Sequence, residues 1–395
     1  MYDLAALREA EFPITRDYVY LNYASIAPLP ECTRRKMAWA LSRLAEQPIN
    51  FWIDEANEMR AYFRKVVADF LNARSADEVV PVPTTATGIN LVAQAIPWQV
   101  GDNVVFCEVE FPANAYPWLN LRRDGVEVRL ATAVSGGLSL ATLEPFIDHH
   151  TRVLAVSALQ FFSGHRTDLA TLGQFCREHN ILFVVDAIQA IGHIPIDVQA
   201  MQIDVLATGG QKSLMAAPGN GFLYVRQEVA AGLHSRFIAA NAVRDYEHWL
   251  HYDLTPLPGA QRFTLGTPNL SGMYGIIESI KLIEKLGRAA IDQHTSQLTA
   301  EIGRLLQQAG YDIITPLQPG KYGPILTFRT NQTPKETDAL VQALREHKIS
   351  VVKHLNAAGE PHIRISFHCY NTMEDVARFM HVWRKLAPST SGRQK

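Results

Sequence analysis

Between residues 80 and 230, short continuous apolar runs alternate with segments in which apolar residues recur at helical spacing. The apolar runs are predicted strands: NVVFCEV (103–109), RVLAVSAL (152–159), ILFVVD (181–186), DVLAT (204–208) and GFLYV (221–225). The segments with helical spacing include TATGINLVAQAI (85–96) and LATLGQFCREHN (169–180). Strands that are apolar at every position and separated by helices indicate a mostly parallel sheet covered on both faces. We therefore expect an α/β fold.

The pattern changes after Tyr274. A long helical region, GIIESIKLIEKLG and then RAAIDQHTSQLTAEIGRLLQQAG, leads to shorter predicted strands: YDIITP, GPILTF, ISVVKHL and PHIRISF. A helix is expected from Pro334 to Lys348, between the second and third of these strands. This mixture predicts a smaller α+β domain, and we expect the N-terminal helix to join it.

A last helix is expected after Thr372, which stands three residues before Asp375 as in a capping box. Its apolar stripe has helical spacing and consists of Met373, Val376, Phe379, Met380 and Trp383. The expected organisation is a large domain over residues 18–275, a small domain over 1–17 and 276–388, and a disordered polar tail over 389–395.

Composition narrows the class of protein. The 395 residues include 37 Lys+Arg and 39 Asp+Glu, which gives a formal net charge of −2. Nucleic-acid and membrane-surface proteins normally carry a basic excess, so this charge balance argues against both classes. The cysteines are far apart and form no CxxC pair, which excludes a disulfide scaffold and a cysteine-rich zinc site; they are Cys32, Cys107, Cys176 and Cys369. The N-terminus has no apolar signal core and no apolar stretch is long enough to span a bilayer, so we expect a cytoplasmic protein.

Candidate chemistry follows the predicted strands at their carboxyl ends, where open α/β sheets bind ligands. Asp186 comes directly after ILFVV, and Lys212 ends the turn that follows DVLAT. The small, hydroxyl-rich turn Thr84–Gly88 opens the helix at 85–96, and the free amides of a helix N-terminus bind anions. Phe111 follows NVVFCEV and places an aromatic ring at another strand end.

Pyridoxal 5'-phosphate (PLP) needs this set of groups. A lysine amine forms the Schiff base with its aldehyde. A carboxylate keeps the ring nitrogen protonated, so that the ring accepts electrons from a substrate carbanion. An aromatic ring lies on the pyridine face, and an anion site holds the phosphate. Each feature alone has an ordinary explanation, such as a solvated lysine, a capping residue or a core phenylalanine. Their common position at strand ends predicts a PLP enzyme.

Other ligand motifs are missing. GGQKS is similar to part of a P-loop, but that motif needs glycine where Leu206 and Gln211 stand. No GxGxxG follows the early strands, which disfavours a nucleotide-linked oxidoreductase. No HExxH or comparable spacing predicts a metal site, so none is expected.

The chain resembles the class V aminotransferase family of PLP enzymes, which contains cysteine desulfurases, selenocysteine lyases, kynureninases and isopenicillin N epimerase-like proteins. The resemblance runs from about Tyr18 to Arg378. The segments that carry it are YLNYASIAPLP (20–30), TTATGINLVA (84–93), EVEFPAN (108–114), FVVDAIQAIGHIPIDV (183–198), ATGGQKSLMAAPGNGFLYV (207–225), FTLGTPN (263–269) and HIRISFHCYNT (362–372). It implies the fold type I architecture of PLP-dependent transferases, with a large domain built on a mostly parallel seven-stranded sheet and a smaller α+β C-terminal domain.

Positions matched to the family receive its roles. Lys212 matches the Schiff-base lysine and Asp186 the partner of the pyridine nitrogen. Phe111 occupies the ring-stacking position. The remaining cofactor contacts implied by the resemblance are the phenolic-oxygen partners Gln160 and Gln189, the phosphate turn Thr85, Ala86 and Thr87, and Gln211 in place of a frequent histidine. Gly209 stands where a phosphate-binding serine is frequent.

The resemblance also implies a substrate site and a dimer. Arg364 matches the arginine that binds the substrate α-carboxylate, a task suited to its planar fork. Asn22 and Ala24 are expected beside the substrate. Thr267 matches a residue that reaches the phosphate of the neighbouring subunit, which implies a homodimer with shared active sites.

The main departure from the family concerns sulfur chemistry. Cysteine desulfurases carry a nucleophilic cysteine roughly 15 residues before the matching arginine, but the stretch Ile349–Ile363 contains none. Cys369 lies after Arg364 and is expected to be a structural thiol. A persulfide-forming desulfurase is therefore disfavoured. We rank an aminotransferase acting on a small amino acid first, by family label, then a C–S β-lyase of the cysteine or cystine type, then an amino-acid epimerase. Retention of Lys212, Asp186, Gln189 and Arg364 argues against a non-catalytic interaction module.

Several further residues have open roles. His165 and Arg166 either line the pocket or, for Arg166, pair with Asp168 to fix the loop. His354 lies near the loop that bears cysteine in desulfurases, and it either acts on a substrate or is solvated, as most loop histidines are. The segment containing Arg244, His248, Trp249 and His251 is a candidate for defining substrate shape.

Overall fold

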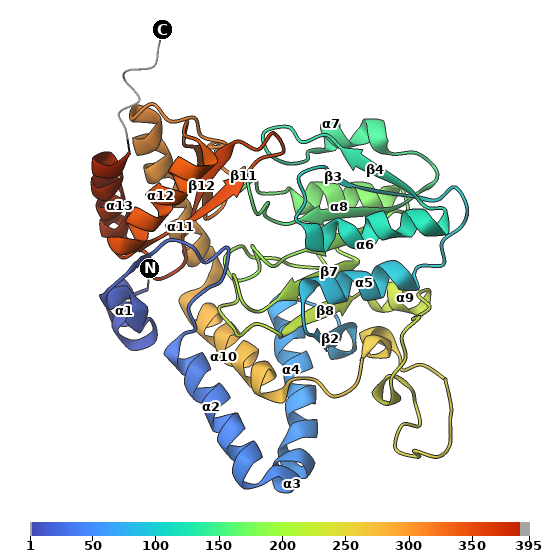
Figure 1. Cartoon of the computed structure of the whole chain (residues 1–395). Coiled ribbons are helices and arrows are strands. Elements are labelled where there is room, and N and C mark those ends of the chain that lie inside the picture. The colour runs from blue at the N-terminus through green and yellow to red at the C-terminus, as the bar shows by residue number, and fades with distance from the viewer. Residues whose placement is uncertain (1, 388–395) are drawn as a thin grey trace.

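The computed structural model describes residues 2–387 and contains the expected large sheet (Figure 1). Its seven strands have the order β2-β8-β7-β6-β5-β3-β4. Strands β3 to β7 run parallel, and β8 runs antiparallel to both of its neighbours. The strands are β2 (Val79–Val82), β3 (Asn103–Cys107), β4 (Glu127–Ala131), β5 (Thr151–Ser157), β6 (Leu182–Asp186), β7 (Val205–Gly209) and β8 (Gly221–Val225). The prediction of a mostly parallel sheet is confirmed.

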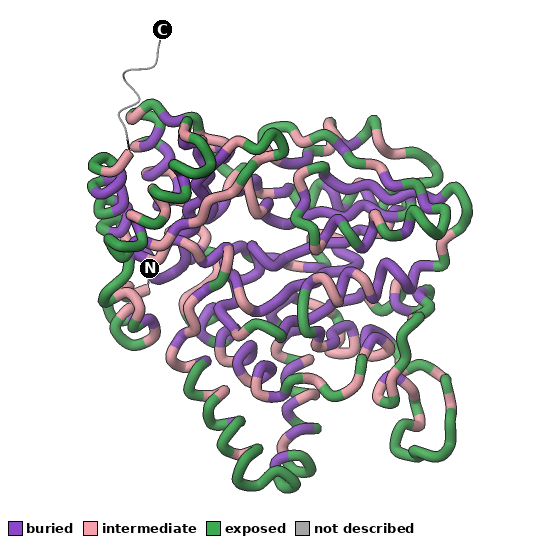
Figure 2. Tube along the Cα trace, in the orientation of Figure 1, coloured by how far each residue is buried: buried purple, intermediate pink, exposed green. Residues whose placement is uncertain are grey.

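Both faces of this sheet are buried, as Figure 2 shows along its strands. Successive residues of a strand enter opposite apolar clusters, so that Val184 of β6 packs on one face and Val185 on the other. Helices α5 (Thr85–Ala95), α6 (Tyr116–Leu119) and α9 (Gln227–Ala231) cover the face of Val184. The face of Val185 is covered by α4 (Ala56–Leu71), α7 (Leu140–Leu143), α8 (Leu169–Glu178) and α10 (Leu270–Leu286). Burial of both faces explains why the strands are apolar at every position.

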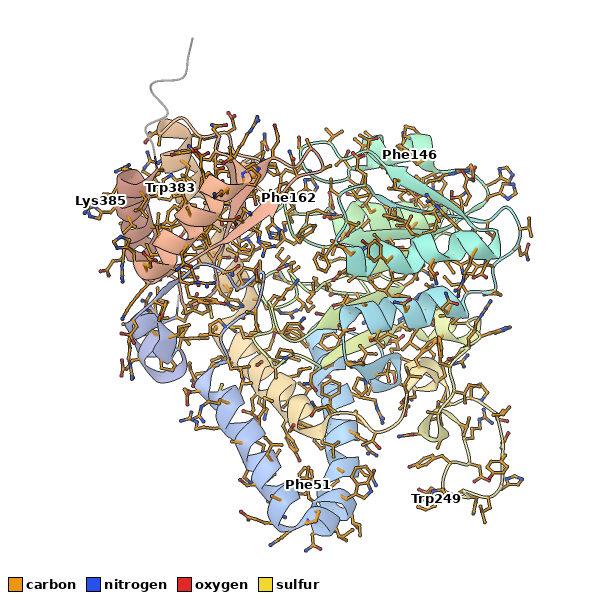
Figure 3. The ribbon with its side chains drawn as sticks, viewed as in Figure 1. Phe51, Phe146, Phe162, Trp249, Trp383 and Lys385 are labelled. Carbon is orange, nitrogen blue, oxygen red and sulfur yellow. The ribbon has the colours of Figure 1, made fainter. Side chains whose placement is uncertain are left out.

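A helical arm projects from the large domain and was not among the expected elements (Figure 1). It consists of α2 (Glu31–Glu46), α3 (Pro48–Asn50) and the first part of α4, and α2 packs along α10. Phe51, labelled in Figure 3, is fully buried near the tip between Trp39 and Tyr274. Much of the arm's remaining surface is exposed, so its pattern lacks the broad apolar face of a core helix.

The C-terminal part forms a second layer of sheet and helix around its own apolar cluster. Strands β9 (Ile325–Arg329), β11 (Val352–Leu355) and β12 (Pro361–Ser366) form an antiparallel sheet in the order β11-β12-β9. Strand β1 (Val19–Tyr20) pairs in parallel with β10 (Ile349–Ser350). The helices are α11 (Arg288–Gln308), α12 (Pro334–Glu346) and α13 (Met373–Leu386).

Helix α1 (Leu4–Glu11) joins this part of the chain, because Arg8 forms an ion pair of 3.0 Å with Asp375. The predicted capping box of α13 is present: Thr372 accepts from the Asp375 amide at 3.1 Å, and Asp375 accepts from the Thr372 amide at 3.0 Å. The stripe prediction is wrong for Met373, whose side chain is exposed because it begins the first turn beside this cap.

The division at residue 275 stays a prediction. That position lies inside α10, whose buried residues from Leu270 to Ile283 all pack in a core of the large sheet. The predicted tail at 389–395 lies outside the described residues. Within residues 2–387, no helix combines the length and apolar character needed to cross a membrane.

Candidate active site

A cavity of about 450 Å³ lies at the carboxyl ends of β6 and β7, between the large sheet and β11 and β12. This volume is typical of small-molecule sites. The predicted site residues that line the cavity are Ala24, Thr85, Ala86, Phe111, Asp186, Gln211, Lys212 and Arg364. Further lining residues are Ser25, Thr84, Ala113, Phe161, Ile188 and His354. Thr87, Gln160, Gln189, Thr267 and Asn22 are not among the lining residues.

Lys212 and Asp186 follow neighbouring strands and both are buried. Burial lowers the pKa of Lys212 to about 8; the charge of Asp186 opposes this and that of Arg364 adds to it. Burial raises the pKa of Asp186 to about 6, against the opposing effects of the Ile188 amide, which donates to it at 2.9 Å, and of Lys212. The site therefore holds a lysine that loses its proton easily and a carboxyl that keeps its proton easily.

Phe111 places an aromatic ring above the lysine. The Lys212 Nζ atom lies 4.9 Å from the centre of the Phe111 ring. Phe161 meets Phe111 edge-on, with 5.1 Å between the ring centres. These rings form an apolar wall on one side of the two charged groups, and such a wall favours a flat aromatic ligand.

Arg364 enters the cavity from β12 and is buried. Its Nη1 atom donates to the Phe161 carbonyl at 2.9 Å, and its Nη2 atom donates to Ser25 Oγ at 2.8 Å. Ser25 in turn donates to Asn22 Oδ1 at 2.8 Å, so Asn22 acts on Arg364 through Ser25. The Nε atom is buried without a partner. Burial lowers the pKa of Arg364 to about 10, which leaves a fixed, poorly solvated cation facing the cavity.

The start of α5 forms the predicted hydroxyl-rich turn. Thr84 caps the helix by accepting from the Thr87 amide at 3.0 Å. The hydroxyl of Thr87 bonds to that of Thr84, with 2.9 Å between the two oxygens, and Thr87 does not line the cavity. The Thr85 hydroxyl is buried without a partner beside the first helical amides. A helix N-terminus with a spare hydroxyl suits a phosphate group.

Three glutamine side chains surround the site, and each has a buried Oε1 atom without a partner. Gln189 donates to the Ala24 carbonyl at 2.9 Å, and Gln160 donates to Glu110 at 2.7 Å. The Oε1 atom of Gln211 lies 2.5 Å from the place that a Cβ atom on Gly209 would take. The Gln211 carboxamide thus occupies the space of a residue-209 side chain, which explains the glycine there.

Of the residues whose roles were left open, His354 lines the cavity, whereas His165 and Arg166 do not. His354 lies on β11 and lines the cavity, so it is not a solvated loop residue. His165 is buried outside the lining, with Nδ1 3.2 Å from the Ser135 carbonyl. Arg166 follows neither alternative: it is not among the lining residues, and it pairs with Asp292 of α11 at 2.8 Å while Asp168 caps α8.

The segment with His248 and Trp249 forms a projecting loop, seen around the Trp249 label in Figure 3. His248 and His251 bond to Asp245 at 2.6 and 3.2 Å, and none of these residues lines the cavity of their own chain. Thr267 lines a separate hollow beside Asn220.

No cysteine is among the residues that line the cavity, and no cluster of His, Cys, Asp or Glu among residues 2–387 is arranged to hold a metal ion. Cys369 is buried, and burial raises the pKa of its thiol. Its amide donates to His368 Nδ1 at 2.8 Å, while the Nε2 atom of His368 bonds to the Ser213 carbonyl at 3.0 Å. Because burial lowers the pKa of His368 to about 4, this histidine is neutral and provides no cation to activate the thiol.

The model of the family described as aminotransferase class-V matches residues 19–379. The chain belongs to the class V aminotransferase family. It is 31% identical over 382 residues to a probable cysteine desulfurase of Methanothermobacter thermautotrophicus, covering 93% of this chain and 94% of that protein. Among solved structures, it is similar to a cysteine desulfurase from Thermococcus onnurineus, with a TM-score of 0.87, 24% identity and 98% of each chain covered. It is also similar to a cystine C–S lyase solved with its reaction product cysteine persulfide, with a TM-score of 0.85, 20% identity, and 96% and 100% covered.

The protein is a PLP-dependent enzyme of the class V family, related to cysteine desulfurases and C–S lyases, with the fold of type I enzymes. The residues present fit PLP, because Thr85 and Gln211 of the cavity lining each have a buried polar atom without a partner, next to a lysine whose pKa is lowered. Sequence reasoning missed Ser25 and Phe161. Both are direct neighbours of predicted residues, Ala24 and Gln160, which was the available signal.

Proposed function

We propose that this enzyme is a β-lyase that breaks the C–S bond of a small sulfur amino acid, of the cysteine or cystine type. The sulfur is released as free sulfide, as a thiol or as a persulfide. The three carbons of the cleaved amino acid are released as pyruvate, and its amino group is released as ammonia. The observation that carries the proposal is the lining of the cavity, which combines Lys212, Asp186 and Arg364 with no thiol. A persulfide-forming desulfurase needs an accessible thiolate near the substrate sulfur.

The roles of the residues follow from their positions. The Arg364 guanidinium binds the substrate α-carboxylate through its planar fork, in an apolar setting that strengthens the contact. The Lys212 amine, with its pKa lowered to about 8, accepts the proton from the substrate α-carbon. Asp186 holds a proton at the ring nitrogen of the cofactor. Bound PLP supplies the electron-accepting ring that makes the α-proton acidic.

The small size of the substrate is supported by the walls of the cavity. Phe111, Phe161 and Ile188 close it with apolar side chains, and Arg364 is the one arginine in the lining. The α-carboxylate of the half of the substrate that reacts satisfies that arginine. The name of one structural relative, a cystine C–S lyase with cysteine persulfide as product, agrees with sulfur release on a small molecule.

The test is product analysis with the PLP-loaded enzyme. Cysteine and cystine should yield pyruvate in equal amount to ammonia, without an added keto acid. A variant with all four cysteines changed to serine should keep at least half of this turnover, and it serves as the control for an enzyme thiol. Alanine as the main product would indicate a desulfurase. Mercaptopyruvate that forms from cysteine only when a keto acid accepts the amino group would indicate the aminotransferase, and D-amino acids would indicate the epimerase.

We also propose that the active enzyme is a homodimer, with Thr267 acting in the partner's site. Large exposed side chains support a partner: Trp249, Leu250 and Tyr252 of the projecting loop are each at least 80% exposed. Subunits carrying Lys212→Ala and Thr267→Ala should be inactive separately and should regain part of the activity when mixed, since a mixed dimer has one intact site. Sedimentation as a monomer at micromolar concentration would contradict the proposal.

A further inference from the structure

His354 belongs to β11 of the small sheet and lines the cavity. Strand β11 pairs with β12 so that Val352 stands opposite Arg364 and His354 opposite His362. His354 and Arg364 are thus diagonal neighbours on one face of the sheet, and such cross-strand neighbours have Cα atoms roughly 7–8 Å apart. Both side chains line the cavity.

Phe161 holds both groups in place. Its carbonyl accepts from Arg364, and its ring meets the His354 ring edge-on with 5.8 Å between centres. Phe162, labelled in Figure 3, meets the same histidine ring edge-on at 6.2 Å. The imidazole is therefore fixed in orientation between two aromatic rings from the loop that follows β5.

The Nε2 atom of His354 is buried and has no partner in the described structure. Burial, together with the charges of Arg364 and Lys212, lowers the pKa of His354 to about 4. The ring is neutral at physiological pH, and a neutral imidazole offers one N–H donor. A buried polar atom without a partner normally costs stability, so an unpaired nitrogen on a residue that lines a ligand cavity indicates a contact made by the ligand.

We propose that His354 donates a hydrogen bond from Nε2 to the sulfur that leaves the substrate, and so selects amino acids with sulfur or another heteroatom at the γ position. The inference rests on the proposed lyase function. The proposal places the α-carboxylate on Arg364 and the γ atom near His354, because Lys212, His354 and Arg364 line one cavity and the charges of Lys212 and Arg364 both act on His354. When the Cβ–Sγ bond breaks, its electron pair stays on sulfur, and the N–H of His354 stabilises this developing negative charge.

The test compares two leaving groups in the PLP-loaded enzyme. Cysteine releases a thiolate that needs stabilisation, whereas β-chloroalanine releases chloride, which leaves without a donor. The variant His354→Phe keeps the contacts with Phe161 and Phe162 but removes both nitrogens. It should lower kcat for cysteine roughly 10- to 100-fold, the range for a hydrogen bond to a charged group, and change kcat for β-chloroalanine less than about 3-fold.

Two further variants separate the hydrogen bond from packing. His354→Gln places an amide nitrogen near the Nε2 position and should recover most of the cysteine activity, while His354→Asn places it nearer Nδ1 and should recover less. His362→Phe is the matched control, because His362 contacts Phe162 at 5.3 Å on the same sheet face but does not line the cavity. It should leave both reactions unchanged.

A binding measurement gives a readout without turnover. 3-Mercaptopropionate carries the carboxylate and the γ sulfur but no amine, so calorimetry can follow it without reaction. His354→Phe should weaken its binding about 3- to 10-fold and leave butyrate unaffected, as expected for one neutral hydrogen bond. Equal losses on cysteine and β-chloroalanine, or equal losses on both ligands, would overturn the role of His354. Absence of pyruvate from either substrate with the unmodified enzyme would instead overturn the lyase function, and this inference with it.

Discussion

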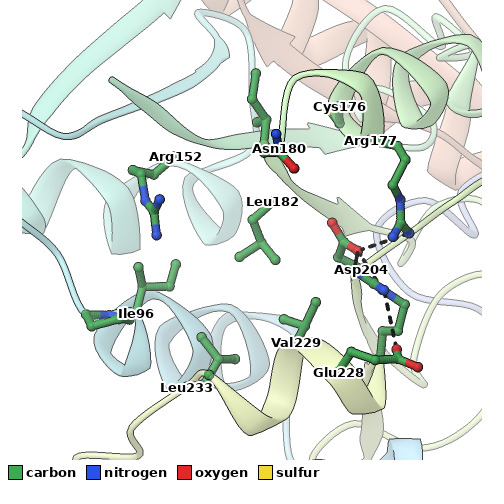
Figure 4. A pocket seen from close by; sticks show the side chains of 14 residues that line it. Ile96, Arg152, Cys176, Arg177, Asn180, Leu182, Asp204, Glu228, Val229 and Leu233 are labelled. Atoms are coloured by element: carbon green, nitrogen blue, oxygen red, sulfur yellow. Dashed lines mark hydrogen bonds and ion pairs between the residues drawn. The ribbon is translucent and has the colours of Figure 1, made fainter. Parts of the chain in front are cut away.

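The large sheet has one cavity at the amino ends of its central strands and another at their carboxyl ends. The two cavities differ in whether their charged side chains form ion pairs within the protein. At the amino ends of the central strands, a cavity of about 320 Å³ lies between β5, β6 and β7 and the helices α8 and α9 (Figure 4). There Asp204 pairs with Arg226 at 2.8 Å and with Arg177 at 3.7 Å, and Arg226 also reaches Glu228 at 3.3 Å. These arginine and carboxylate side chains therefore form ion pairs with one another within the protein.

At the carboxyl ends, the charges are left open. Within residues 2–387, Lys212, Asp186 and Arg364 form no ion pair, although all three are buried. Keeping charged groups buried and unpaired costs free energy, so such a set is retained where a ligand completes it. Cavities of similar size thus differ in function because one has its charges paired internally and the other offers them to a ligand.

The largest expected effect is that of Lys212→Ala. It should abolish the cofactor that borohydride traps on the protein and lower kcat roughly 10³-fold or more, because the amine both binds the cofactor and moves the α-proton. Absorbance of the bound cofactor and peptide mapping after reduction provide the measurement. Lys281→Ala, which alters an exposed lysine, is the control. Trapping on a lysine other than Lys212 would contradict the assignment.

Asp186→Asn should lower kcat roughly 10²- to 10³-fold, the scale of losing a buried charge interaction with the protonated ring nitrogen. In the protein without cofactor, the same substitution should raise the free energy of unfolding. Because the pKa of Asp186 is raised to about 6 in the fold, ionisation destabilises the native state as pH rises from about 4 to 6. Above pH 6, the variant should be more stable than the wild type by about 3 kcal/mol, measured by urea unfolding. A less stable variant at pH 7 would contradict the direction.

Arg364→Lys should raise KM for amino-acid substrates roughly 10- to 100-fold, since a lysine cannot keep the contacts with Phe161 and Ser25 and also offer a planar fork. Steady-state kinetics with cysteine and β-chloroalanine should show the same increase for both, because both share the carboxylate. An increase restricted to one of them would place Arg364 elsewhere on the substrate.

The smallest effect on activity is expected at the other edge of the sheet. Arg226→Met removes the ion pair with Asp204 but leaves Arg177 and the Phe183 amide as partners of that carboxylate. It should lower the free energy of unfolding by about 1–3 kcal/mol and change kcat/KM less than about twofold. A tenfold loss of activity at unchanged stability would show that this cavity, too, takes part in function.

Local sequence patterns allowed a large part of the fold to be predicted. Continuous apolar strands, the helix start at Thr84 and the capping box at Thr372 depend on neighbours within a few residues, so they can be read from the chain. The same holds for the approach of Asp186 and Lys212, because parallel strands bring their carboxyl ends to one edge of a sheet. Resemblance to the family then placed Phe111, Gln211 and Arg364, all of which line the cavity.

Only the tertiary structure decided which groups complete the site. Arg364 is held by Ser25 and Phe161, 339 and 203 residues away, and no periodicity encodes such contacts. Arg166 forms an ion pair with Asp292 and not with Asp168, which is closer in the sequence but caps helix α8. His354 reached the cavity through the pairing of β11 with β12. The chain itself therefore determined the elements and the chemical types at strand ends, whereas the packing of the large sheet against β11 and β12 determined which side chains meet, since that depends on shape and burial over long separations.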